Sequence, residues 1–417
     1  MKRSFLVAAL ALLFAGQAAR TQPPATLAPP PAVAGSVNPA PAPPPPGFDA
    51  PSLIPDGGAP DGGEHVWVSA EALIWYLRGM HVPPLVSSSP AGTARDQAGV
   101  LGSTGTDVLY GGDRVNSDAH FGGRFAVGYM NPDASWPIGF EGNFFTLATT
   151  SANFNAPSDP NTIVGRPFFD PSAGRQDALL VNFPGAISGA TAINSTSFLL
   201  GAEALVRENL YQNGGLRIDG LAGYRFLNLR EQLHITDNFT STDPTSALPV
   251  GTGVLVNDNF ETVNYFHGAE VGVKAIWGSG PLALDTTLKL AVGGDNHRLV
   301  INGFTTTATP GATPAVTPGG LLAQPTNSGR TNGTDWALVP EAAANLRWDL
   351  NSHLRLTAGY SFLWWNSVVR PGDQIDTVIN RTGLSGGTLT GEQRPVLQTT
   401  TSGIWVQGIQ FGLTYSF

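Results

Sequence analysis

Ten runs of residues in which every second side chain is apolar constrain the fold of this chain more than any other feature. They cover residues 66–77, 119–130, 137–149, 195–207, 215–236, 260–277, 282–302, 334–348, 353–366 and 403–417. A period of two belongs to a β-strand with two unlike faces, so the sequence predicts ten strands. Several runs exceed the roughly 9–11 residues that a tilted strand needs to cross a membrane, so their ends would project beyond it.

The connections between these runs are alternately long and short. The long ones are 78–118, 150–194, 237–259, 303–333 and 367–402, and the short ones are 131–136, 208–214, 278–281 and 349–352. Outer-membrane barrels combine short periplasmic turns with longer outer loops, whereas a soluble β-sandwich has no reason to keep this asymmetry. The sequence therefore predicts an all-β fold: a transmembrane, antiparallel, up-and-down barrel of about ten strands, or twelve if a loop folds back as a hairpin.

Charged side chains within the runs fall almost entirely on one face. Only 13% of all residues are charged, against about 25% in an ordinary soluble domain. A lysine or arginine facing lipid at mid-membrane costs about 2–4 kcal/mol, so we assign the apolar face to lipid and the charged face to the lumen. The predicted lumen charges are Glu71, Arg124, Glu141, Glu203, Arg207, Arg217, Asp219, Arg225, Glu270, Lys274, Asp285, Lys289, Glu341, Arg347 and Arg355.

Seven of these lumen residues are acidic and eight are basic, so their charges nearly balance. Barrels of about eight strands have interiors filled by side chains, whereas 16–18 strands leave an aqueous channel. Two hypotheses follow for ten strands. The charges pair with one another and plug the barrel, or they line a narrow ion path.

Aromatic residues lie near the ends of the runs on the apolar face. Trp336 and Trp348 are twelve residues apart, which spans roughly 30 Å for a tilted strand and matches an apolar band with its interfaces. Trp and Tyr favour that boundary because their rings are amphipathic. The predicted aromatic girdle consists of Tyr76, Tyr129, Trp277, Trp336, Trp348, Trp364, Trp405 and Tyr415.

The last run ends on Phe417 with its apolar face intact to the final residue. We expect this run to be the closing strand, paired with the first strand and facing lipid. A terminal Phe on an alternating strand also resembles the signal that the barrel assembly machinery reads. That resemblance assigns the signal to Phe411, Leu413, Tyr415 and Phe417.

The N-terminal residues predict export. Lys2 and Arg3 precede an apolar run from Phe5 to Ala15, which is too short to span a bilayer as a helix. Residues 1–18 are therefore interpreted as a signal peptide for the Sec route. Residues 19–63 are rich in Pro, Ala and Gly and are predicted to be a disordered leader, followed by the barrel at 64–417. The predicted location is the bacterial outer membrane.

Other chemistry finds little support in the sequence. A net charge of −9 argues against a nucleic-acid partner, and the absence of cysteine excludes thiolate metal sites. The seven histidines form no HExxH pair, and none accompanies a plausible serine nucleophile. The sequence therefore predicts no enzyme, no catalytic or metal site and no cofactor.

Several short motifs carry a resemblance to a known family. They are "VWVSAEALIWYL" at 66–77, "GGRFAVGY" at 122–129, "PIGFEGNFF" at 137–145 and "GIQFGLTYSF" at 408–417. They are similar to bacterial barrels grouped as putative beta-barrel porin family seven, a resemblance that covers about residues 64–417. It implies a porin-like outer-membrane protein and assigns no catalytic residues.

Two functions remain open from these observations. The first is a porin-like, narrow passive channel with a charge-lined lumen. The second is a structural or surface-binding barrel that acts through its long extracellular loops. The expected partners are outer-membrane lipid, the barrel assembly machinery and, for a channel, small ions or solutes.

Overall fold

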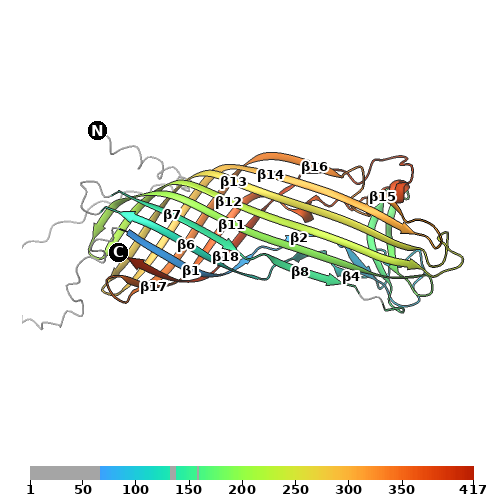
Figure 1. Ribbon diagram of the computed structural model, residues 1–417, viewed down its shortest axis with the longest axis horizontal. Coiled ribbons are helices and arrows are strands. Elements are labelled where there is room, and N and C mark those ends of the chain that lie inside the picture. Colours follow the sequence, from blue (N-terminus) through green and yellow to red (C-terminus); the bar gives the residue numbers. More distant parts are fainter. Residues whose placement is uncertain (1–65, 132–137, 157–158) are drawn as a thin grey trace, which may run out of the picture. The chain divides into compact units, whose positions relative to one another are not determined.

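A closed ring of ten antiparallel strands dominates the computed structural model, which describes residues 66–131, 138–156 and 159–417 (Figure 1). The ring strands are β1 (Val66–Leu77), β6 (Ala119–Met130), β7 (Ile138–Leu147), β11 (Ile187–Asn213), β12 (Leu216–Ser241), β13 (Gly253–Ser279), β14 (Leu282–Ala308), β16 (Gly329–Asp349), β17 (Leu354–Val369) and β18 (Thr401–Ser416). The predicted ten-stranded barrel is confirmed. The predicted signal peptide and leader, and the turn around Pro132, lie outside the described residues.

The last strand closes the ring against the first. β18 pairs with β1 from Trp67 opposite Ser416 to Leu77 opposite Val406. The ladder continues to the end of the chain, where the Phe417 N–H donates to the Val66 carbonyl at 3.0 Å. The strongly apolar C-terminus is therefore one side of the barrel seam, as its alternation predicted.

The hairpin between β11 and β12 has the turn chemistry that a two-residue connection requires. Gly214 and Gly215 have φ angles of 55° and 83°. A type I′ turn needs positive φ at both central residues, a conformation that glycine adopts without a Cβ penalty. This turn and the turn at 280–281 lie at the short-turn end of the barrel, which is the periplasmic end in outer-membrane barrels.

The four strands β11 to β14 are 26 or 27 residues long, and therefore much longer than a membrane crossing needs. Parts of the predicted loops 150–194, 237–259 and 303–333 are strand, so those loop boundaries were wrong. The ladder explains the difference. Each extended strand keeps a paired neighbour, so backbone hydrogen bonding continues where the Thr-, Ser- and Asn-rich sequence loses its apolar alternation.

Short elements fill the long connections. β8 (Thr150–Asn155) extends the wall along β11, and β15 (Ala315–Pro318) pairs with β14. The others are β2 (Met80–His81), β3 (Val86–Ser88), β4 (Asp107–Tyr110), β5 (Arg114–Val115), β9 (Val164–Asp170), β10 (Arg175–Asn182) and the 3-10 helices η2 (Pro371–Gln374) and η3 (Arg381–Gly386). None of the described helices is long and apolar enough to cross a membrane.

The outer face of the barrel wall towards the short-turn end is apolar and exposed, as a lipid-facing surface must be. Phe121, Phe125, Val271 and Leu346 are each more than half exposed. Meanwhile, the charged side chains on the same strands turn inward. This segregation is the one that the membrane imposes, because lipid cannot solvate a charge.

A lysine placed in this apolar band should cost far more than one placed outside it. Leu288 lies midway between Leu282 and Gly294, the partner of Trp336, and is 58% exposed. We expect Leu288→Lys to lower the unfolding free energy by about 2–4 kcal/mol. Val316 on β15 is 67% exposed, and there we expect Val316→Lys to change it by less than about 0.5 kcal/mol. Urea titration of the lipid-reconstituted barrel measures both, and equal losses would contradict the assigned lipid face.

Candidate functional site: the lumen

The inner face changes character along each strand. On β1 the inward residues from the periplasmic end are Trp67, Ser69, Glu71, Leu73, Trp75 and Leu77. The polar pair Ser69 and Glu71 lies towards the short-turn end, and three fully buried apolar side chains follow. The lumen therefore has a charged lower part and an apolar upper part.

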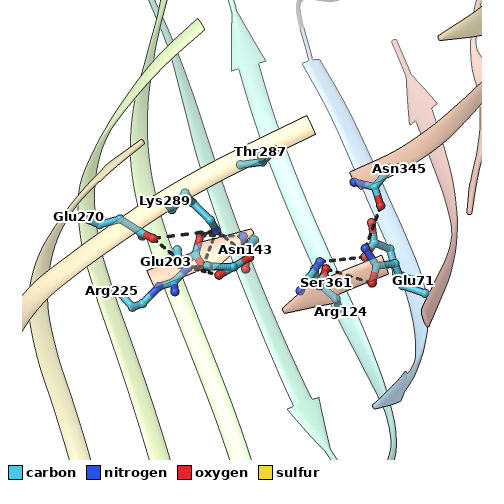
Figure 2. A network of polar contacts seen from close by, with 12 residues as sticks. Glu71, Arg124, Asn143, Glu203, Arg225, Glu270, Thr287, Lys289, Asn345 and Ser361 are labelled. Atoms are coloured by element: carbon cyan, nitrogen blue, oxygen red, sulfur yellow. Dashed lines mark hydrogen bonds and ion pairs between the residues drawn. The ribbon is translucent and has the colours of Figure 1, made fainter. Parts of the chain in front are cut away.

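Five buried residues from five strands form what we call the central charge cluster: Glu203, Arg225, Glu270, Lys289 and Glu341. Figure 2 labels the first four of them. Arg225 pairs with all three glutamates, and its Nη2 lies 2.8 Å from Glu270 Oε1. Lys289 Nζ lies 2.7 Å from Glu203 Oε2 and 3.2 Å from Glu341 Oε1. Because the partners come from β11, β12, β13, β14 and β16, the cluster ties together half of the ring.

The cluster resembles a metal site only in part. Glu203, Glu270 and Glu341 bring one carboxylate oxygen each within 4.8 Å of one another, which is the donor set of a hard cation. However, the Arg225 and Lys289 head groups already lie among these oxygens. Two positive and three negative charges leave a net charge of −1. A metal ion would have to displace these cations, so the residues do not fit one.

A second group of ion pairs lies nearer the periplasmic end. Asp219 Oδ2 is 2.5 Å from Arg207 Nη2, and Asp219 Oδ1 is 2.9 Å from Arg217 Nε. Lys274 pairs with Asp285 at 3.1 Å. Arg207, Arg217, Lys274 and Asp285 border a polar cavity of about 150 Å³ in the lower lumen. The cavity is large enough for a few water molecules.

The structure places all fifteen predicted lumen charges on the inner face. Glu71 and Arg124 pair across β1 and β6 at 3.2 Å, while Arg355 pairs with Asp349 at 2.5 Å near the lower rim. Glu141 and Arg347 line the cavity beside them. Asn345, Ser361 and Gln410 add a polar chain, in which Gln410 donates to Asn345 at 2.8 Å and Ser361 donates to Gln410 at 3.0 Å. Most of the predicted lumen charges therefore form ion pairs with one another.

An apolar layer lies in the lumen above the central charge cluster. Its side chains come from nine of the ring strands. They are Leu73, Trp75, Leu77, Phe145, Leu147, Leu199, Leu227, Leu229, Phe266, Ala291, Ala337, Val339, Leu363, Trp365, Val368, Ile404 and Val406, each at most 3% exposed. The Trp75 and Phe145 ring centroids lie 5.3 Å apart, and those of Phe266 and Trp365 lie 6.0 Å apart. This layer was not identified from the sequence. Its members on β1, Leu73, Trp75 and Leu77, follow Glu71 at every second position and therefore point to the same inner face.

The upper end of β17 contributes to this layer by separating from β16, while it stays paired with β18 up to Val369 opposite Thr401. Its register with β18 shifts between Trp365 and Val368, which marks a β-bulge. Beyond the bulge, the backbone of Val369 exchanges two hydrogen bonds of 2.8 Å with the side chain of Asn264 on β13. β14 and β16 separate β13 from β17 in the ring, so this contact joins strands that are not neighbours in the wall, and the chain enters the lumen here.

Arg370 fixes two long loops above the apolar layer. Its guanidinium makes two hydrogen bonds to Glu231, at 2.6 and 2.8 Å, and donates to the carbonyls of Arg78 and Gly79 at 2.9 and 3.1 Å. Both charged side chains are at most 3% exposed. Arg370 was missed because it lies in the predicted loop 367–402, where strand periodicity gives no orientation.

Removing the contact between Arg370 and Glu231 should make the loops more mobile and leave the pairing of the barrel strands intact. We expect Arg370→Gln to increase proteolysis within residues 370–400 severalfold, because Glu231 loses its only bidentate partner among the described residues. Heat-modifiable gel migration should still report a folded barrel. Arg394→Gln removes a more exposed loop pair with Asp376 and should leave the cleavage rate nearly unchanged. Equal cleavage of the two variants would contradict the role of Arg370.

Another buried charge group lies further outside the membrane. Arg166 Nη1 is 2.6 Å from Asp237 and its Nη2 is 3.6 Å from Asp258. Asp258 also accepts the backbone N–H groups of Leu322 and Ala323. Burial raises the pKa of the Asp258 carboxyl even though Arg166 lies beside it. These contacts hold two loops inside the extracellular part of the barrel.

The residues of the predicted girdle and terminal signal face outward. Trp336 is 82% exposed and Trp348 51%, at opposite ends of the apolar band. Tyr76, Tyr129, Trp277, Trp364 and Tyr415 are exposed on the same outer surface, and Trp405 is partly exposed. Phe411 and Leu413 are exposed on the outer face of β18, and Phe417, which directly follows that strand, is exposed as well.

Comparison with known proteins gives one family and several barrels. The sequence model described as Putative beta barrel porin-7 (BBP7) matches residues 67–417. No curated protein matches the chain. Among solved structures, the outer membrane protease OmpT from Escherichia coli is similar at 10% identity and a TM-score of 0.36, covering 85% of this chain and 97% of its own. A Pseudomonas aeruginosa FadL homologue is similar at 8% identity and a TM-score of 0.19, covering 84% and 90%.

Proposed function

We propose a function for this chain from the premise that it belongs to the Putative beta barrel porin-7 family and is an outer-membrane β-barrel protein. The proposal has two parts. The lumen is closed, and the protein works as a structural or surface-binding barrel through its extracellular loops. The observation that carries the proposal is the apolar layer. Water and ions cross a hydrophobic constriction only where it is wide enough to stay wet. In this layer Trp75 and Trp365 are 2% and 0% exposed.

The extracellular part supports the second half of the proposal. A buried apolar core lies there, formed by residues of the extended strands and of the long connections, among them Phe168, Phe260 and Leu322. Arg166 and Arg370 pair with buried carboxylates there. A packed, internally tied structure of this kind presents a fixed surface, which is what a binding platform or a structural element needs.

A narrow passive channel is the second candidate. The cavity of about 150 Å³ in the lower lumen favours it, because charged residues of both signs line it. Such a channel would require the apolar layer to move. In either case, we propose outer-membrane lipid and the barrel assembly machinery as partners, and export by the Sec route.

Solute flux into proteoliposomes tests the proposal. We expect vesicles that contain the folded barrel to swell in isosmotic sugar or salt no faster than empty vesicles do. Heat-modifiable migration of the same sample shows that the barrel is folded. Swelling that scales with the amount of folded protein would contradict a closed lumen and favour the channel.

A further inference from the structure

The barrel wall is incomplete between β16 and β17. β16 keeps its partner β14 from Trp348 up to Gly329, but its pairing with β17 begins only at Glu341 opposite Leu363. From Gly329 to Pro340 the other edge of β16 has no strand beside it among the described residues. The cause is the inward turn of β17 described above, which removes the neighbour.

The sequence of β16 fits a free edge. Leu338 donates its backbone N–H across the gap to Asn366 Oδ1 at 2.8 Å. In an antiparallel ladder alternate residues point their backbone groups to the same side, so the even-numbered residues of β16 point into the gap. Pro340, which has no N–H to donate, stands at the point where pairing stops. Above Leu338, residues 330, 332, 334 and 336 are all exposed.

The inner side of this edge carries two acidic side chains, Asp295 and Asp335. Asp335 Oδ2 lies 3.5 Å from Nδ1 of His297, and burial lowers the pKa of that imidazole. Asp335 lies opposite Asp295 of β14, and the two share the inward face. The Asp335 side chain is 48% exposed, whereas Asp295 is fully buried. Across the described ranges, Asp295 has no paired cation and accepts no well-formed hydrogen bond. A buried carboxylate without a partner is costly, so the site favours an incoming cation.

We propose that the edge Arg330–Trp336 binds an extended polypeptide segment that carries a basic side chain. The segment would add a strand to β16 and bond to its free N–H and C=O groups. Its inward side chain next to Asp335 would be a cross-strand neighbour of that carboxylate, and Lys or Arg there would bring a permanent positive charge to the two acidic side chains. Because Trp336 belongs to the outer girdle, the edge beyond it lies in water on the extracellular side. This partner class rests on the proposed surface-binding function.

Proline substitution tests the backbone part of the proposal. Thr334→Pro removes one N–H that points into the gap, at an edge position where a fold tolerates proline. Thr334→Ala keeps that N–H and loses only the hydroxyl bond to Asn296, so it is the matched control. The probe is a dye-labelled synthetic peptide of alternating threonine and valine with one central lysine. We expect its affinity, measured by fluorescence anisotropy on the reconstituted barrel, to fall about tenfold or more with Thr334→Pro and less than about twofold with Thr334→Ala.

Charge substitution tests the side-chain part. We expect Asp335→Asn to weaken the lysine peptide about fivefold and to leave a norleucine peptide unchanged, since only the first can pair with the carboxylate. Asp107→Asn removes a carboxylate from the exposed strand β4 and should leave both peptides unchanged.

Three results would overturn the proposal: unchanged binding in Thr334→Pro, equal binding of a peptide with glutamate in place of lysine, or displacement by dodecylamine, a cation without backbone groups. Failure of the proposed function would be visible separately, as solute flux through the folded barrel. A barrel that is closed and binds no peptide would refute this inference alone.

Discussion

Replacing Arg225 with methionine should lower the unfolding free energy of the barrel by about 3–5 kcal/mol, because it leaves buried glutamates without their main partner. In the native cluster two cations face three carboxylates, for a net charge of −1, whereas in the variant Lys289 alone faces the same three, for a net charge of −2. Lys289 touches Glu203 and Glu341 closely but lies 4.0 Å from Glu270. The loss is measured by urea titration, as the change in the urea concentration at which half of the protein no longer migrates as the folded, heat-modifiable band.

A double variant separates the charge effect from lost packing. Arg225→Met with Glu270→Met restores the net charge of −1, since one cation then faces two carboxylates. Replacing a buried ion pair by apolar residues of similar volume is often neutral, so most of the stability should return. Arg298→Met breaks a half-exposed pair with Glu261 on the wall and should cost less than about 1 kcal/mol. If the double variant is less stable than Arg225→Met, the cluster does not act as a buried charge balance.

Removing the two tryptophans of the apolar layer should turn a silent barrel into a conducting one. Trp75 and Trp365 are among the largest fully buried side chains in the described chain and project into the lumen from β1 and β17. Trp75→Ala with Trp365→Ala leaves a gap above the charged cavity, where water can enter and ions can follow. We expect discrete current steps in a planar bilayer. Because seven acidic and eight basic residues line the lumen, selectivity between cations and anions should be weak.

Because this double variant is expected to lose stability, a less destabilised single variant should be measured beside it. Each buried Trp→Ala change costs about 3–5 kcal/mol, so gel migration must first show that the barrel persists. Trp365→Ala alone keeps Trp75 and should give rarer or smaller steps. Trp336→Ala removes an equally large side chain from the outer surface, where it is 82% exposed, and should stay silent. Currents in Trp336→Ala equal to those of the double variant would show that the openings come from a damaged wall.

The barrel itself could be predicted from the sequence because two independent patterns agree. Alternation over strands such as 119–130 fixes which face meets lipid, and the long and short connections fix the order of the strands around the ring. β6 has the predicted bounds, and its Arg124 pairs with Glu71 of the neighbouring strand. In a meander each strand pairs with its sequence neighbours, so local pattern is enough.

The apolar layer in the lumen could not be predicted in the same way. Alternation shows that Trp75 points inward with Glu71, but it does not show what Trp75 meets across the barrel. The inward turn of β17 depends on a bulge near Asn366 and on the long-range contact between Val369 and Asn264, which no periodicity encodes. Arg166 and Arg370 were missed for the same reason, since their carboxylate partners lie on strands distant in sequence.

The most direct measurement for the central claim is single-channel recording on the refolded wild-type barrel. Heat-modifiable gel migration first shows that the barrel is folded. The apolar layer predicts a flat trace at applied potentials of either sign, in the same bilayers where Trp75→Ala with Trp365→Ala gives steps. Steady, discrete openings from the folded wild-type barrel would contradict the closed lumen and establish the narrow channel.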